Sequence, residues 1–541
     1  MRTPRTFRQW SRFARWADKS ARPELVEGRA VGCSWFDRFT TSVGTDIGAQ
    51  QTRPLHTFIA IALILAPISV AAQPPAQVEP SPTQGVVKKG KVPVSNEILK
   101  IKLPKAVEVD LPNGLHLMVL EDHRLPQLSF QIFIPGAGGY YDPADQPGLA
   151  SFVAALMREG TASRTSEQIS QQLEVMAASL TVGAGAGLEA SVNGTSLTDQ
   201  FDKLLDIAAD VLLHPSFPEE ELARYQQRTR AQLTQQRANP GFLAAELFNR
   251  VIYGTHPASR ISPTVAALDA ATRGALAAFH RTRYVPDHAG MAVAGDISPA
   301  DARKLVEAKL GGWPKSGAAA PAVSDPAELT APKISFIARP NSVQTNLIVG
   351  TQAISRIHPD YDVLQVMNKV IGGGPTGRLF IHLREEKGYT YGAGSGLSAP
   401  IFRGDWSAST SVRSEVTEPA LRDLLAEIAQ LRDQLVSDQE LADAKRSMIA
   451  SFALSLESPA QLLNYHVTRW RYKLPADYWD RYPDRVSGVT RQQVQAAART
   501  YLDARRMQIV AVGDPARVGD TLKKLGTVET FDAEGKRISP L

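Results

Sequence analysis

Residues 372–391 read GGGPTGRLFIHLREEKGYTY, and this stretch decides how the rest of the chain is interpreted. It opens with three consecutive glycines, Gly372, Gly373 and Gly374. Glycines allow positive φ and a close approach of the backbone to a ligand. The apolar residues that follow predict a short helix ending near Arg384, before a strand that begins near Tyr391. An arginine and a tyrosine placed in this way can converge on one acceptor, such as a peptide carbonyl. The same pattern is also typical of an arginine at a helix end and a tyrosine packed in a sheet.

The length of 541 residues is too great for one hydrophobic core and predicts two or more domains. An apolar fraction of 43% and a charged fraction of 21% are ordinary for a globular protein. The formal net charge is +5, but the whole excess of basic residues lies ahead of Gln73. The remainder is formally neutral, so we expect no nucleic-acid partner.

The apolar run FIAIALILAPISV at residues 58–70 is typical of the hydrophobic part of a signal peptide. It is too short to span a bilayer, and small residues at 70 and 72 predict cleavage after Ala72. We therefore expect a periplasmic protein whose mature chain has no membrane span.

The segment before residue 54 has no helical or strand period. We hypothesise that translation starts downstream, for example at the codon of Val43. The single cysteine, Cys33, then lies outside the mature chain, which excludes thiol chemistry and disulfides. Residues 73–104, rich in Pro, Gln and Val, are expected to form a flexible tether.

Two halves of the chain show the same order of patterns. Asn113-Gly114 between alternating apolar residues predicts a hairpin, and Thr165 followed by Gln168 predicts a capping box at a helix start. A Gly-, Ala- and Pro-rich linker at 311–333 separates the expected domains at 105–310 and 334–541.

The two halves can be aligned residue by residue from matching short motifs. Thr272-Arg273 precedes Gly295-Asp296 by the same spacing that separates Thr490-Arg491 from Gly513-Asp514, so that position 272 corresponds to position 490. We therefore predict an α+β fold of two homologous domains of about 220 residues, each a mainly antiparallel sheet covered by helices.

Together, this duplication, the secretory signal and the 372–391 stretch resemble the insulinase/pitrilysin family of zinc peptidases, the inverzincins, over residues 105–530. In that family, residues spaced as Arg384 and Tyr391 hold the substrate backbone and stabilise the developing oxyanion. The resemblance thus implies catalytic and substrate-binding roles for this pair. It also places the three glycines at the substrate.

The metal-binding half of the family pattern is degenerate. The family carries H-x-x-E-H on a helix and a further Glu on a later helix. The corresponding run here is GLASFVAALMREGT, which places Ser151 and Ala155 at the histidines, Ala154 at the catalytic Glu and Gln232 at the third ligand. These side chains cannot replace imidazole and carboxylate, so we expect no metal or other cofactor in this chain.

Other sites are not indicated by the sequence. No two histidines of the mature chain have the helical spacing of a metal pair beside an acidic residue. His256 is expected to be structural. His382, next to Arg384, is expected to be a solvated helix-surface residue, with contact to substrate as the alternative. Gly394-Ser395-Gly396 and the glycines at 183, 185 and 187 match neither a nucleophile elbow nor a dinucleotide fingerprint.

Three functions remain open. The resemblance favours a non-catalytic subunit that pairs with a zinc-bearing homologous subunit and lends Arg384 and Tyr391 to the hydrolysis of a peptide substrate. The alternatives are a stand-alone peptide-binding protein that uses an exposed strand edge, and a scaffold of a larger complex.

Overall fold

The structure is a computed structural model, and it describes residues 99–317 and 322–538. The expected signal peptide at 58–70, its cleavage after Ala72, Cys33 and most of the expected tether lie outside the described residues. In the described part of the chain, no helix is both long enough and apolar enough to cross a membrane.

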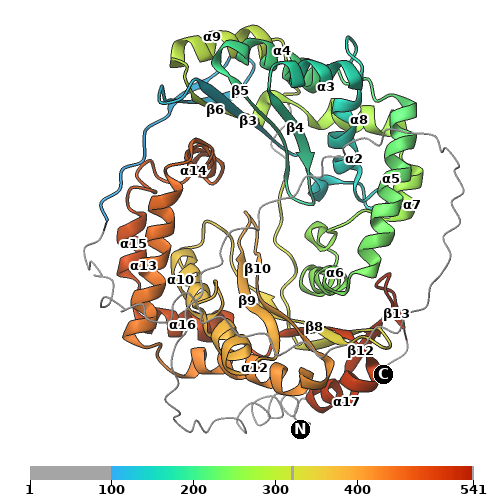
Figure 1. The fold of residues 1–541 in the computed structure, drawn as a ribbon, viewed down its shortest axis with the longest axis vertical. Helices are drawn as coiled ribbons and strands as arrows, with labels where there is room; N and C mark the ends of the chain where they lie inside the picture. The colour runs from blue at the N-terminus through green and yellow to red at the C-terminus, as the bar shows by residue number, and fades with distance from the viewer. Residues whose placement is uncertain (1–98, 318–321, 539–541) are drawn as a thin grey trace, which may run out of the picture. The chain divides into compact units, whose positions relative to one another are not determined.

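The first half contains a six-stranded sheet in the order β1-β2-β6-β3-β5-β4, and Figure 1 labels its strands β3, β4, β5 and β6. Its strands are β1 (Val107–Asp110), β2 (His116–Glu121), β3 (Gln127–Pro135), β4 (Ser179–Ala184), β5 (Glu189–Leu197) and β6 (Gly290–Gly295). Only the β2–β6 pair is parallel. The hairpin predicted at Asn113-Gly114 joins β1 to β2, and Gly114 takes the positive φ of +89° that the turn requires.

The helices of the first half are α2 (Leu149–Leu156), α3 (Ser166–Val175), α4 (Phe201–Leu213), α5 (Glu219–Ala238), α6 (Pro240–Tyr253), α7 (Val265–Ala270), α8 (Arg273–Arg283) and α9 (Pro299–Leu310). Thr165 and Gln168 form the predicted capping box of α3. Buried residues of α2, α3, α4, α8 and α9 pack with the sheet into one hydrophobic core.

The second half contains a seven-stranded sheet in the order β13-β12-β7-β11-β8-β10-β9. Its strands are β7 (Lys333–Ala338), β8 (Gln344–Gln352), β9 (Thr390–Ser398), β10 (Asp405–Arg413), β11 (Gln508–Gly513), β12 (Val528–Phe531) and β13 (Arg537–Ile538). Strand β11 runs parallel to β7 and antiparallel to β8, as β6 runs relative to β2 and β3. The predicted α+β fold with two mainly antiparallel sheets is confirmed.

The helices of the second half are α10 (Tyr361–Ile371), α11 (Arg378–Phe380), the π-helical turn η6 (Ile381–Glu386), α12 (Thr417–Asp433), α13 (Asp438–Ser455), α14 (Pro459–Arg471), α15 (Tyr482–Gly488), α16 (Arg491–Tyr501) and α17 (Pro515–Leu525). The predicted repeat is seen as the same order of a capped helix and a buried strand in both halves. Thr272 caps α8 before the buried strand β6, and Thr490 caps α16 before the buried strand β11.

Each half sends one helix onto the sheet of the other half. Apolar residues of α6, including Leu247 and Phe248, pack with Ile337, Val510 and Val512 of the second sheet. Leu462, Leu463 and Val467 of α14 pack with residues of β2, β3 and β6 in the first sheet. Every residue of β6 and β11 is buried. Strands that are buried on both faces are nearly uniformly apolar, as the sequences of these two strands are.

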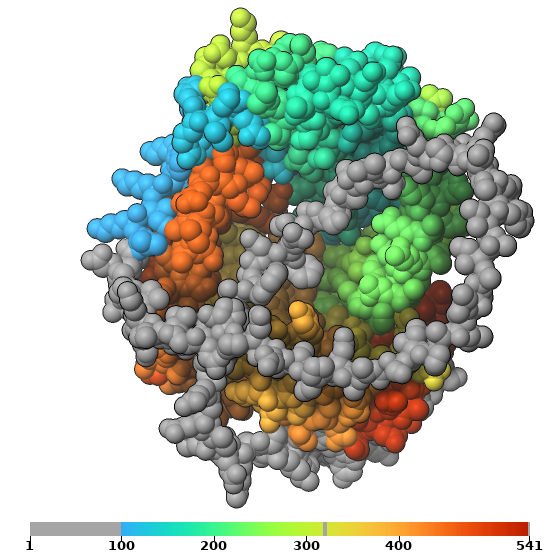
Figure 2. All heavy atoms as spheres, in the orientation of Figure 1, coloured from blue at the N-terminus to red at the C-terminus, as the bar shows by residue number. Residues whose placement is uncertain are grey.

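Helix α14 and the segment that follows it also contact the chain just before β1. His466 Nε2 lies 2.8 Å from the carbonyl oxygen of Pro104, and the backbone N–H of Leu103 donates to Asp480 Oδ1 at 2.8 Å. Figure 2 shows the orange atoms of this region against blue atoms from the start of the described chain. The two halves are therefore joined by polar contacts in addition to the exchanged helices.

One partly buried carboxylic acid lies where the halves meet. Asp405, on β10, accepts a hydrogen bond of 2.6 Å from the Tyr253 hydroxyl on α6. Burial raises the pKa of Asp405 to about 6, although the hydrogen bond from Tyr253 opposes the shift. Because the folded-state pKa lies above the unfolded value, the protonated acid favours the folded state.

We expect this acid to make the protein less stable as the pH rises from about 4 to 7. Stability is fully present below the unfolded pKa and is lost through the folded pKa, by up to about 3 kcal/mol for a shift of this size. Asp405→Asn, which keeps an acceptor for Tyr253, should remove this part of the pH profile. The measurement is denaturant unfolding of both proteins at pH 4.5 and 8. Asp145→Asn, at an exposed position, is the control, and equal pH dependence of parent and Asp405→Asn would contradict the assignment.

Candidate functional site

The glycines at 372–374 lie between α10 and α11, beside strand β9. Ser395 N donates to Gly372 O at 2.9 Å, and a Cβ on Gly372 would lie 2.5 Å from that nitrogen. The carbonyl of Gly373 accepts from Lys369 Nζ at 2.9 Å, and Gly374 has φ of +129°. Packing therefore requires glycine at 372 without any ligand. The expected substrate contact of Gly372, Gly373 and Gly374 stays a prediction.

Arg384 and Tyr391 lie side by side. The guanidinium carbon of Arg384 is 5.3 Å from the Tyr391 ring centre and 4.6 Å from that of Phe380, within the range of cation–π attraction. Its Nη1 is 3.0 Å from Glu385 Oε1. The side chain of Tyr391 is 90% exposed, and its hydroxyl has no hydrogen-bond partner among the described residues. The two side chains can thus reach a common ligand.

Arg384 stands on a π-helical turn. The expected short helix is one turn of α-helix, α11, followed by the wider turn η6. Such turns are rare and occur frequently at functional sites. The widened turn ends at Glu386, and β9 begins at Thr390, so the chain reverses between the arginine and the tyrosine.

His382 fixes this turn to α12, and its expected role as a solvated surface residue was wrong. Its Nδ1 lies 2.8 Å from Glu427 Oε1, and its Nε2 lies 3.9 Å from Asp423 Oδ2. Both carboxylates are buried. The hydrogen bond to Glu427 raises the pKa of His382. The contacts of this imidazole with two buried acids tether the turn that carries Arg384 to α12.

A second ion pair anchors the start of the same segment. Arg378, the first residue of α11, donates from Nε and Nη2 to the two carboxylate oxygens of Glu440, at 2.6 and 3.1 Å. Glu440 also completes the capping box of α13 with Ser437. Burial would raise the pKa of Glu440, but the hydrogen bonds from Arg378 and Ser437 outweigh it and lower the pKa to about 2.

The positions that correspond to the family's zinc-binding and catalytic residues carry side chains that do not bind zinc. Ser151, Ala154 and Ala155 lie on α2, and the Ser151 hydroxyl donates to Gly148 O at 2.7 Å. Gln232 is exposed on α5. Zinc requires imidazole, thiolate or carboxylate donors, so these four residues do not fit the metal.

A phenol lies beside Ser151 instead. Tyr225 of α5 packs edge-on to Phe152 of α2, and its hydroxyl interacts with those of Thr229 and Ser151. Burial raises the pKa of Tyr225 more than these interactions lower it, so the phenol is neutral. Within residues 99–317 and 322–538, no three His, Cys, Asp or Glu side chains are grouped as metal ligands. His256 is buried among Tyr140, Tyr253 and Phe402, in keeping with its expected structural role.

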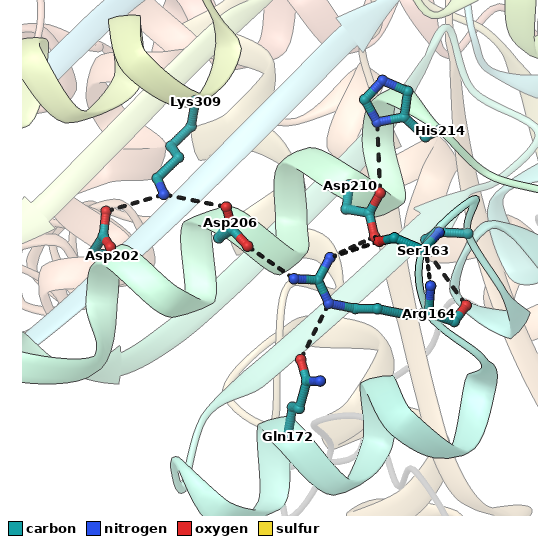
Figure 3. A network of polar contacts seen from close by, with 9 residues as sticks. Ser163, Arg164, Gln172, Asp202, Asp206, Asp210, His214 and Lys309 are labelled. Carbon is teal, nitrogen blue, oxygen red and sulfur yellow. Dashed lines mark hydrogen bonds and ion pairs between the residues drawn. The ribbon is translucent and has the colours of Figure 1, made fainter.

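A cavity of about 590 Å³ lies in the first half, between α3, α4 and α9. Arg164, Asp202, Asp206 and Lys309 of its lining belong to the network drawn in Figure 3. Arg164 bonds to Asp206 and Asp210, while Lys309 lies within 3.3 Å of both Asp202 and Asp206. Because these cations are already paired, the network is best explained as a link between helices. It shares no residue with the 372–391 stretch.

Sequence profiles of known families match both halves. Residues 118–261 match the family described as Insulinase (Peptidase family M16), and residues 270–448 match the Peptidase M16 inactive domain. Similar proteins include an uncharacterized zinc protease of Rickettsia felis, 26% identical over 65% of this chain and 84% of its own length. Another is the uncharacterized zinc protease YmxG of Bacillus subtilis, 24% identical over 64% of this chain and 83% of its own.

Solved structures give the same result. A peptidase M16 inactive domain from Pseudomonas fluorescens is 30% identical and superposes with a TM-score of 0.71, covering 76% of this chain and 98% of that one. A protease from Helicobacter pylori has a TM-score of 0.70 and covers 76% of this chain and 100% of its own, but at 16% identity it shows the fold alone.

Proposed function

Because this chain belongs to the M16 (insulinase) family of peptidases, we propose that it is the non-catalytic subunit of a periplasmic heterodimeric zinc metallopeptidase. The observation that carries the proposal is an asymmetry between the halves. Arg384 and the exposed Tyr391 lie together in the second half, whereas the metal-ligand positions of the first half hold Ser151, Ala154, Ala155 and Gln232.

The proposed roles follow from the side chains. The guanidinium of Arg384 offers a planar fork of donors that would hold a peptide carbonyl. The free hydroxyl of Tyr391 would donate to the oxygen that becomes negative when the peptide bond is attacked. The partner, a homologous subunit with an intact H-x-x-E-H helix, would supply the metal and the base.

A stand-alone peptide-binding protein is the second candidate. Strand β9, which carries Tyr391, is an edge strand of the second sheet, and β4 is an edge strand of the first. An exposed edge can add a peptide as a further strand. The glycines at 392, 394 and 396 would weaken such pairing, which favours the first candidate.

Purification of the tagged chain from native periplasm tests the proposal. We expect a 1:1 complex with a homologue that carries H-x-x-E-H, with peptide hydrolysis by the complex and not by this chain alone. Metal analysis of the separated chains should place about one zinc on the partner and none on this chain.

Other outcomes would replace the proposal. A homodimer that binds peptides without a partner would support the stand-alone binding protein. A stable complex with proteins unrelated to peptidases would support a scaffold. Stoichiometric zinc on this chain would show that its ligands lie elsewhere.

A further inference from the structure

A second cavity, of about 350 Å³, lies in the second half between the loop that precedes α10 and the segment between α14 and α15. Residues at its apolar and aromatic wall are Ile357, Pro359, Tyr361, Leu474, Pro475 and Tyr478. Its volume is at the lower end of the range for small-molecule sites. None of these residues belongs to the 372–391 stretch.

Arg356 is a buried cation in this wall. The residue is 7% exposed, and its guanidinium carbon lies 3.9 Å from the Tyr361 ring centre and 5.2 Å from that of Tyr478. Its Nη1 donates to the Tyr478 hydroxyl at 3.0 Å. In the described part of the chain, no carboxylate lies within 4 Å of it, and its Nε and Nη2 have no hydrogen-bond partner.

The acids of the cavity are already engaged by other arginines. Asp362 Oδ2 lies 2.6 Å from Arg485 Nε, and Asp477 Oδ2 lies 3.9 Å from Arg481 Nη1. Arg356 therefore contributes a positive charge that the cavity itself does not balance. Stacking on the tyrosines offsets part of the cost of burying its guanidinium, and the N–H groups of Nε and Nη2 are free to donate to a ligand.

A carboxylate is the group that matches these unused donors. Its two oxygens accept parallel hydrogen bonds from a guanidinium, and such charge-assisted pairs are stronger than neutral ones. Ile357, Leu474 and Pro475 would pack against an apolar group attached to that carboxylate. The C-terminal residue of a peptide combines these two features.

We propose that this cavity binds a carboxylate carried on a small apolar group, as at the C-terminal residue of a peptide. The proposal rests on Arg356 and its surroundings and does not depend on a partner subunit or on Arg384 and Tyr391. A peptidase subunit with such a site would hold the free carboxyl end of a peptide, either substrate or product.

Calorimetric titration of the full chain with N-acetyl-leucine and with N-acetyl-leucinamide tests the proposal. The two ligands differ only in the carboxylate, so the amide is expected to bind at least about tenfold more weakly. A short peptide ending in leucine should compete with N-acetyl-leucine. Equal binding of acid and amide, no binding of the acid at millimolar concentration, or tighter binding of inorganic phosphate would each overturn the proposal.

A matched pair of variants places the ligand in the cavity. Ile357 is 58% exposed, so its replacement is not expected to unfold the chain. Ile357→Glu would bring a carboxylate to the cavity and compete for Arg356, lowering the affinity for N-acetyl-leucine at least about tenfold. Ile357→Gln has the shape of Glu without its charge, so it measures the loss of the apolar contact alone, and it should bind N-acetyl-leucine at least about fivefold more tightly than Ile357→Glu does. If both variants bind as the parent does, the ligand lies elsewhere and the proposal is wrong.

Discussion

Tyr391→Phe is expected to lower kcat of the paired peptidase about a hundred- to a thousandfold with little change in KM. The change removes one hydroxyl, and the loss of one donor to a developing oxyanion typically costs about 2.7–4 kcal/mol. A donor that acts only in the transition state affects kcat, whereas one that binds the substrate equally in both states affects KM. Steady-state kinetics of the reconstituted complex on a peptide substrate would measure both quantities.

Because of the position of Tyr391, a change in rate can be separated from a change in folding or assembly. The side chain is 90% exposed and its hydroxyl bonds to no described residue, so the variant should fold and assemble like the parent. A tyrosine that served only for packing would tolerate the change without any effect on rate. Unchanged kcat in a complex of normal stoichiometry would therefore favour the scaffold function.

Arg384→Ala is expected to lower kcat by a similar factor and also to raise KM, because a guanidinium can hold a substrate carbonyl before and during the reaction. Arg384→Lys keeps the charge but loses the fork, and it should recover only part of the activity. Lys387→Ala, which removes an exposed cation from the same segment, is the control and should be silent. An equal loss in Lys387→Ala would indicate a general effect of charge.

The spacing of Arg384 and Tyr391 could be recognised from the sequence, but their environment could not. The pattern predicts a helix end followed by a strand, and the structure has both. His382 was misjudged because its partners, Asp423 and Glu427, lie on a separate helix, α12, that follows two intervening strands. Local sequence patterns contain no information on such contacts. The π-helical turn has no sequence signature that distinguishes it from an α-helix.

In the fold, too, features set by residues close in sequence could be predicted, whereas contacts between distant parts of the chain could not. Helix starts such as Thr165 and the hairpin at Asn113-Gly114 were predicted because capping and turn chemistry act within a few residues. Helix α14 was not predicted, although Leu462, Leu463 and Val467 form an apolar stripe. Its partner is the sheet of the other half, far earlier in the chain. The residue types at the metal-ligand positions can be identified from the sequence, whereas Tyr225 beside Ser151 became visible only in the folded chain.

Phe248→Ala is expected to destabilise both halves of the protein. Phe248 is 4% exposed on α6, and a Cβ on Gly350 of β8 would lie 2.6 Å from its Cζ, so the ring rests directly on the strand backbone. Removing a buried phenylalanine typically costs about 3–5 kcal/mol, because transfer free energy is lost and a cavity remains. Equilibrium unfolding in guanidinium chloride, followed by tryptophan fluorescence and by circular dichroism, would measure the loss.

The exchange of helices determines how this loss is distributed. Since α6 belongs to the chain of the first half but covers the second sheet, its weakening should increase hydrogen exchange in β7 and β11 as well as in α6. Leu463→Ala should have the reciprocal effect on β2 and β6, at a cost of about 2–5 kcal/mol. Leu454→Ala, at a position 68% exposed on α13, is the control and should change stability by less than about 1 kcal/mol. If Phe248→Ala raised exchange only within the first half, α6 would not stabilise the second sheet, and the two halves would be independent folding units.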